Sequence, residues 1–234
     1  MTNDRWAIAF DADDTLWHNE RGFQLTQSRF AEMLGDVAEP DHLMDRLLAA
    51  ERRNLAIYGF GVKGFVLSMI ETAIEVTNGR VGADVISELL AMGRAMLEEP
   101  VDLLPGVREA IEAIKPNADL LVITKGDLLD QERKLAQSGL GDLFDQVEIV
   151  SDKTPDVYAH IFARFPTTRC MMVGNSVRSD IIPALEAGAW GVHVPHDLTW
   201  AYEQAEAPVD HRRFRQITSL DALPDLLIEV ASLR

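Results

Sequence analysis

The stretch Trp6-Ala7-Ile8-Ala9-Phe10-Asp11-Ala12-Asp13-Asp14-Thr15-Leu16 decides the fold. It begins with five apolar residues, and so short an apolar run ended by polar residues is typical of a buried strand in a parallel sheet. Three carboxylates follow within four positions, and their charges repel one another unless something offsets them. The segment therefore predicts a central strand with an acidic loop at its carboxyl end.

Short apolar runs of the same kind recur later in the chain, at residues 120–123, 147–150, 170–173 and 191–194. They alternate with segments whose apolar residues have helical spacing, at 107–114, 128–138, 157–163, 181–187 and 220–233. Strands that alternate with helices indicate βαβ units. The fold class predicted from residue 105 onward is α/β, with a doubly wound parallel sheet.

The stretch between the first and second expected strands breaks this alternation. It contains no convincing strand but has helical apolar spacing at 23–34, 42–58, 65–77 and 83–97, with breaks at 59–61 and 78–80. We therefore expect two domains: an α/β core of residues 1–17 and 100–234, and a helical domain of residues 18–99. Its two connections to the core would act as hinges.

Composition excludes several classes of function. The 234 residues carry 38 acidic and 22 basic side chains, for a formal net charge of −16. An acidic chain does not favour non-specific binding to nucleic acid or to an anionic membrane. One cysteine, Cys170, permits neither an internal disulfide nor a cysteine metal cluster. With no signal-peptide-like or membrane-spanning apolar run, we expect a cytoplasmic protein.

The residues that follow the apolar runs are the candidates for chemistry, because ligands of open α/β sheets bind at the carboxyl ends of the strands. Asp11, Asp13 and Asp14 follow the first run, and their oxygen-only ligands suit Mg²⁺. The later runs are followed by Thr124, by Lys153, and by a loop from Gly174 to Asp180. Each has an ordinary alternative: an acidic turn, a helix cap, a surface lysine, or an acid at a helix start. Their shared position at one edge of the sheet favours a functional site.

This arrangement resembles the haloacid dehalogenase superfamily over nearly the whole chain. The first motif of that family, Asp-x-Asp-x-Thr after the first strand, is matched by Asp11, Asp13 and Thr15. The later motifs are matched by Thr124, by Lys153 and, in part, by the loop that holds Asn175 and Asp180. The helical insert resembles the α-helical cap of the family.

The resemblance implies a Mg²⁺-dependent phosphatase that acts on a small phosphorylated metabolite through an aspartyl-phosphate. Asp11 would be the nucleophile and Asp13 the acid and base, while Thr124 and Lys153 would bind the phosphoryl group. Asp11 and Asp180, with the main-chain carbonyl of Asp13, would hold the metal.

Two positions depart from the family pattern. Asn175 stands where many members have aspartate; its amide oxygen can still bond a metal-bound water, so we expect weaker metal binding rather than none. Thr154 separates Lys153 from Pro155, whereas many members have lysine and proline adjacent.

Several other functions fit parts of the pattern. A sugar-phosphate phosphomutase shares the whole core, and a 2-haloacid dehalogenase shares it without needing the second aspartate of the first motif. A phosphate-accepting signalling module also combines acids, a hydroxyl and a lysine, but needs no helical cap. A catalytically inactive binding protein would account for Asn175 but not for the intact pair Asp11 and Asp13.

The sequence gives only weak indications of which residues select the substrate. The glycine-flanked Phe60 and the nearby Lys63 are expected on a loop of the helical domain, where they are candidates for substrate specificity.

Overall fold

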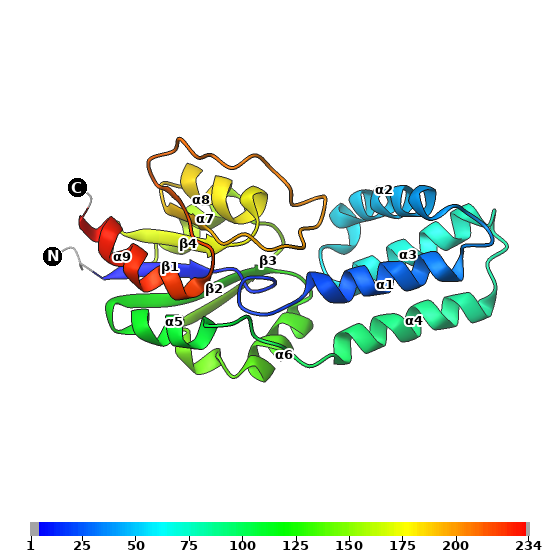
Figure 1. The fold of residues 1–234 in the computed structure, drawn as a ribbon, viewed down its shortest axis with the longest axis horizontal. Helices are drawn as coiled ribbons and strands as arrows, with labels where there is room; N and C mark the ends of the chain where they lie inside the picture. The colour runs from blue at the N-terminus through cyan, green and yellow to red at the C-terminus, as the bar shows by residue number, and fades with distance from the viewer. Residues whose placement is uncertain (1–4, 233–234) are drawn as a thin grey trace. The chain divides into compact units, whose positions relative to one another are not determined.

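The computed structural model describes residues 5–232 and divides them into two compact units (Figure 1). The first unit comprises residues 5–18, 101–124 and 132–232. The second unit comprises residues 19–100 together with residues 125–131. The sequence did not indicate that the segment 125–131 would group with the helical insert.

Within residues 5–232 the first unit contains a six-stranded sheet in the order β3-β2-β1-β4-β5-β6. The strands are β1 (Trp6–Phe10), β2 (Ala118–Lys125), β3 (Gln146–Val150), β4 (Cys170–Gly174), β5 (Trp190–His193) and β6 (Phe214–Gln216). The pairs that β1 forms with β2 and β4, and that β5 forms with β4 and β6, are parallel. The predicted α/β class with a doubly wound parallel sheet is confirmed.

Each strand contributes apolar side chains to both faces of this sheet, because successive side chains of a strand point to opposite sides. Ile8 and Phe10 of β1 join one apolar cluster, and Ala7 and Ala9 join the other. The first cluster includes side chains of α5 (Val107–Ile114) and α9 (Leu223–Ser232), and the second includes side chains of α7 (Pro155–Phe162) and α8 (Ile182–Glu186). In Figure 1, α9 crosses in front of the strands, and α7 and α8 lie above them. Burial on both faces explains why the strands appear in the sequence as continuous apolar runs.

The second unit is built mainly from four helices: α1 (Glu20–Met33), α2 (Pro40–Tyr58), α3 (Val62–Val76) and α4 (Ala83–Glu98). One apolar cluster fills its interior, with Phe30, Leu43, Phe65 and Met69 almost completely buried. Helices α3 and α4 pack closely at Gly93. A Cβ atom added there would lie 2.4 Å from the side chain of Val66, so the contact requires glycine. The unit therefore has a core of its own.

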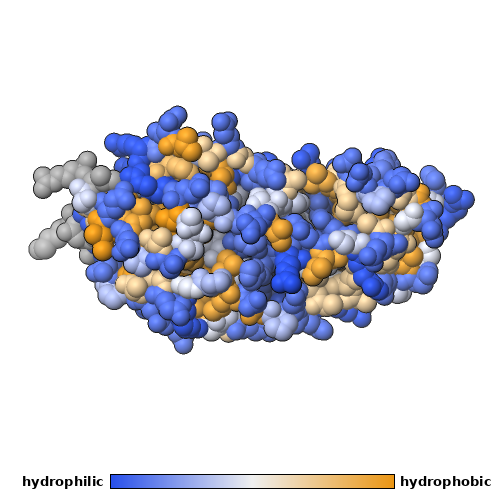
Figure 2. Space-filling model, viewed as in Figure 1, coloured by the Kyte–Doolittle hydropathy of each residue, from blue (hydrophilic) through white to orange (hydrophobic). Residues whose placement is uncertain are grey.

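Figure 2 shows hydrophilic residues over much of the visible surface, with apolar residues at scattered positions. Among the helices that the structure describes, none is both long and apolar enough to cross a membrane.

Three elements differ from the sequence expectation. Strand β6 was not predicted, because it is three residues long and only Phe214 of it is buried. The helix expected from residue 181 is preceded by one π-helical turn, Val177–Ile181. The last helix begins at Leu223 after a 3₁₀ turn, and the predicted end at Leu233 lies outside the described residues.

The start of α7 explains the residue inserted between Lys153 and Pro155. Thr154 is the N-cap of α7, and its hydroxyl accepts a hydrogen bond from the backbone N–H of Val157 at 3.3 Å. Pro155 occupies the first helical position, where its missing N–H costs nothing. Thr154 therefore starts the helix that follows Lys153.

We predict that Thr154→Ala lowers the free energy of unfolding by about 1 kcal/mol, because the first turn of α7 loses its side-chain acceptor. Thr154→Ser is the matched control, since it keeps a capping hydroxyl, and it should remain close to the wild type. Urea denaturation of the three proteins measures the difference. Equal stability of the alanine and serine variants would contradict the capping role.

Candidate active site

The carboxyl ends of β1, β3 and β4 contribute three charged side chains to one buried cluster. The Lys153 ammonium donates to Oδ1 of Asp180 at 2.6 Å and also to Oδ1 of Asp11. The exposed fractions are 8% for Asp11, 5% for Lys153 and 0% for Asp180. Two carboxylates thus share one buried cation, and the three charges leave the cluster formally negative.

Burial and charge act in opposite directions on these groups. Desolvation is the largest influence on Asp11 and raises the pKa of its carboxyl above the ordinary value, although the Lys153 charge partly opposes this. Desolvation lowers the pKa of Lys153, but the charges of Asp11 and Asp180 and its hydrogen bonds to both outweigh it, so its pKa is raised. Lys153 therefore stays protonated, and more positive charge would favour ionised Asp11.

Local backbone structure positions the acids. The N–H of Asp11 donates to the Val173 carbonyl at 2.9 Å, which ties the end of β1 to the end of β4. The other oxygen of Asp180, Oδ2, accepts at 2.9 Å from the N–H of Ser176, the N-cap of the π-helical turn. A Cβ atom at Gly174 would lie 2.3 Å from this oxygen, so only glycine fits beside Asp180.

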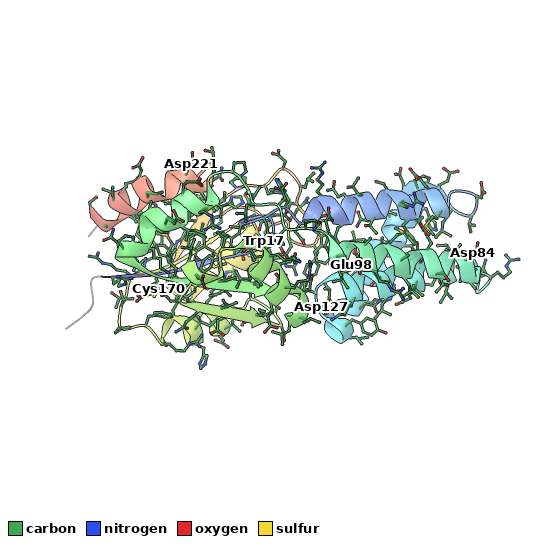
Figure 3. The ribbon with its side chains drawn as sticks, turned by 90° about the horizontal axis from the view of Figure 1, so that it is seen from below. Trp17, Asp84, Glu98, Asp127, Cys170 and Asp221 are labelled. Atoms are coloured by element: carbon green, nitrogen blue, oxygen red, sulfur yellow. The ribbon has the colours of Figure 1, made fainter. Side chains whose placement is uncertain are left out.

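The side chain of Asp13 belongs to a different set of contacts. Its Oδ1 accepts from the indole Nε1 of Trp17 at 2.7 Å and from Nζ of Lys134 on α6 (Leu128–Ser138) at 2.7 Å. Figure 3 labels Trp17 within the α/β unit. The structure therefore brings Asp11, Lys153 and Asp180 into one cluster and holds the Asp13 carboxylate through other partners.

Asn175 and Thr15 bond to each other. The Thr15 hydroxyl donates to the amide oxygen of Asn175 at 3.4 Å and accepts from the Asn175 N–H at 3.1 Å. Thr124 is buried near the end of β2, whose register pairs Val122 with Phe10, so it lies at the same sheet edge as Asp11. The strand continues to Lys125, which corrects the expectation that it ends before Thr124.

Sequence reasoning missed the partners that support these groups. Lys134 lies in the middle of a helix, and Glu203 lies in the long segment between β5 and β6. One oxygen of Glu203 accepts from the hydroxyls of Ser176 and Ser179. Ser176 is the N-cap of the π-helical turn that carries Asp180, and Ser179 lies within that turn. A lysine in a helix and a glutamate in a loop look like surface residues, so the sequence carried no signal for either.

The candidate specificity residues lie in the second unit. The Phe60 ring lies in a bend between α2 and α3, with Nζ of Lys125 at 3.9 Å from its centroid. Lys63 was expected on a loop, but it lies in the first turn of α3. Its Nζ is 3.3 Å from Oδ1 of Asp127. Both residues therefore contact the segment that directly follows Thr124.

The single cysteine is not part of the site. Figure 3 shows Cys170 well apart from Trp17, and Cys170 begins β4 in register with Ala7, near the amino end of β1. Burial raises the pKa of its thiol to about 11, which disfavours the reactive thiolate.

The donor chemistry of the site fits a magnesium ion. The Asp11 and Asp180 carboxylates converge on one cation, the Lys153 ammonium, and oxygen donors are those that Mg²⁺ prefers. Across residues 5–232, however, no three side chains of aspartate, glutamate, histidine or cysteine are grouped so that they could hold a metal ion. A magnesium site here would therefore combine these two carboxylates with main-chain oxygen and water, which Mg²⁺ usually retains.

We predict that Lys153→Met lowers the free energy of unfolding by about 3–5 kcal/mol in metal-free buffer near pH 8, because two buried carboxylates lose their shared cation. Lys63→Met is the control, since that side chain is 57% exposed and its ion pair should contribute less than about 1 kcal/mol. Adding Asp180→Asn to Lys153→Met should recover part of the loss. Urea denaturation tests this, and equal stability of the two single variants would show that the cluster does not stabilise the fold.

Comparisons with known proteins identify the family of this chain. The family model of haloacid dehalogenase-like hydrolases matches residues 7–188. A haloacid dehalogenase-like family hydrolase from Xanthomonas campestris is 39% identical, with a TM-score of 0.87 over 98% of this chain and 93% of that one. Hexitol phosphatase B from Escherichia coli is 28% identical over 67% of this chain and 79% of its own length. The magnesium-bound protein YfnB from Bacillus subtilis shares the fold, with 18% identity, a TM-score of 0.66, and coverage of 95% of this chain and 99% of its own. The chain is therefore an enzyme of the haloacid dehalogenase-like hydrolase family.

Proposed function

We propose that this enzyme is a Mg²⁺-dependent phosphatase that hydrolyses a small phosphorylated metabolite through an aspartyl-phosphate on Asp11. The observation that carries the proposal is the buried cluster of Asp11, Lys153 and Asp180, with Asp13 two residues beyond Asp11. The match to a hexitol phosphatase supports phosphate esters as the substrate class.

In the first half of the reaction, a carboxylate oxygen of Asp11 attacks phosphorus as the bond from phosphorus to the ester oxygen breaks. Asp13 gives its proton to the leaving oxygen, so that an alcohol departs. In the second half, Asp13 takes a proton from water, and the water oxygen attacks phosphorus. Inorganic phosphate leaves, the Asp11 carboxylate is restored, and Asp13 is protonated again.

The surrounding residues would stabilise charge on the phosphoryl group. Lys153 provides a buried ammonium beside Asp11, and Thr124 provides a hydroxyl at the neighbouring strand end. Magnesium, held by Asp11, Asp180 and the main-chain carbonyl of Asp13, would supply positive charge that offsets the repulsion between Asp11 and the phosphate dianion. Asn175, whose amide oxygen already bonds Thr15, would at most contact a water of the metal.

The first test is turnover of a panel of phosphate monoesters that includes para-nitrophenyl phosphate, sugar phosphates and sugar-alcohol phosphates. We expect hydrolysis that requires Mg²⁺, stops with EDTA and returns when Mg²⁺ is restored. Asp11→Asn should reduce turnover by at least about 10³-fold on every ester, because the nucleophile is gone. Full activity after rigorous metal removal, or in Asp11→Asn, would overturn the mechanism.

We also propose that Phe60 and Lys63 influence substrate choice, because both contact residues 125–127, which directly follow Thr124. Replacing both by alanine should lower kcat/KM for the preferred natural ester by about 10-fold or more, while para-nitrophenyl phosphate loses little. Leu67→Ala, at an exposed position of the same helix α3, is the control and should affect neither ester. Equal losses on both esters, or none on either, would remove Phe60 and Lys63 from substrate choice.

A further inference from the structure

The Asp13 carboxylate is held by two donors that come from different parts of the first unit. The Trp17 indole N–H and the Lys134 ammonium both end on the same oxygen, Oδ1, each at 2.7 Å. Hydrogen bonds of this length to an ionised carboxylate are among the stronger ones in proteins. Two donors on one oxygen restrict rotation of the carboxyl group more than a single donor would.

Trp17 is a rigid donor because its backbone and ring are both fixed. Trp17 is 1% exposed and belongs to the core cluster that includes Ile8 and Phe10 of β1. The N–H of Asp14 donates to the carbonyl of Trp17 at 2.7 Å, which closes the turn that directly follows Asp13. Backbone bridges join Trp17 to Asp13 and to Leu103, so the indole N–H has little freedom to move away from the carboxylate.

Lys134 is the less ordinary of the two donors. Its side chain is only 10% exposed, although a lysine usually keeps its ammonium in water. Burying an ammonium is unfavourable unless a partner compensates, and here the Asp13 carboxylate is such a partner. A purely structural explanation is that the pair anchors α6 to the loop after β1, and this explanation predicts an effect on stability alone.

The reaction places a stricter demand on Asp13 than anchoring does. Asp13 must give a proton to the leaving oxygen in one half-reaction and take one from water in the other, so its carboxyl group must keep one position through both. A displacement of about 1 Å in such a group can cost on the order of 100-fold in rate. Two donors on Oδ1 provide this constraint.

We propose that Lys134 and Trp17 are positioning residues that hold the Asp13 carboxylate in the orientation for proton transfer to the leaving group. The inference rests on the proposed phosphatase function. It assigns a role to a helix residue outside the strand-end motifs. Its signature is a dependence on the leaving group, because only a poor leaving group needs the proton of Asp13 as it departs.

The experiment measures kcat/KM, which reports the steps up to the first phosphoryl transfer. It compares para-nitrophenyl phosphate with an alkyl phosphate that the wild type hydrolyses. Lys134→Met should lower kcat/KM by about 10–100-fold on the alkyl ester and less than about 3-fold on para-nitrophenyl phosphate. Lys134→Arg, which keeps a cationic donor, should recover most of the loss on the alkyl ester.

Three further variants make the comparison specific. Asp13→Asn sets the full size of the leaving-group effect. Trp17→Phe removes the indole donor but keeps a ring in the core, and it should show the same pattern; it also carries the test if Lys134→Met does not fold. Arg133→Met removes a cation from the neighbouring position of α6 and should leave both esters unchanged.

The outcomes separate this inference from the proposed function. If the wild type hydrolyses neither ester, the proposed function fails and the inference fails with it. In a second case, the wild type and Asp13→Asn behave as proposed, but Lys134→Met and Trp17→Phe lose kcat/KM equally on both esters or lose none. Only the positioning role is then overturned. A selective loss on the alkyl ester, with recovery by arginine, supports it.

Discussion

The shared contact of Asp11 and Asp180 with the Lys153 ammonium is the constraint on which much of the first unit depends. These groups lie where water does not compensate their charges, so each needs the others at close range. Asp11 follows the central strand, Asp180 follows the neighbouring strand β4, and Lys153 follows β3. The ends of three strands must therefore keep their positions for the cluster to form.

The sheet order explains why the basic member of the cluster is a lysine from β3. Strand β3 is separated from β1 by β2, and neighbouring strands lie about 4.8 Å apart. The side chain that connects them has to extend past the end of β2, where Thr124 is located. The long, flexible stem of lysine suits this distance, and its ammonium is a compact charge that two carboxylates can share. The ammonium thereby reaches the Asp11 carboxylate at the end of the central strand.

Much of the fold could be predicted because its physical causes are local. Strands buried on both faces appear as short apolar runs, and the residues that follow them lie at one sheet edge, so Asp11, Lys153 and Asp180 could be grouped without coordinates. Lys134 and Glu203 could not be predicted, because their contacts join segments far apart in the chain, and nothing in the neighbouring sequence marks them as buried partners. Strand β6 was too short to have a pattern, and nothing in the local sequence marked the π-helical turn in which Asp180 lies beside Gly174.

Trp17 joins two properties that are separate in many enzymes. Its ring fills part of the main apolar cluster, and its indole N–H bonds to Asp13. A change in core packing that shifts the ring by a fraction of an ångström therefore also shifts the acid that lies beside it, without any substitution at the site itself. Efforts to engineer a more heat-resistant form of this enzyme by refilling its interior would need to leave the neighbours of Trp17 unaltered, or thermostability would be gained at the expense of turnover.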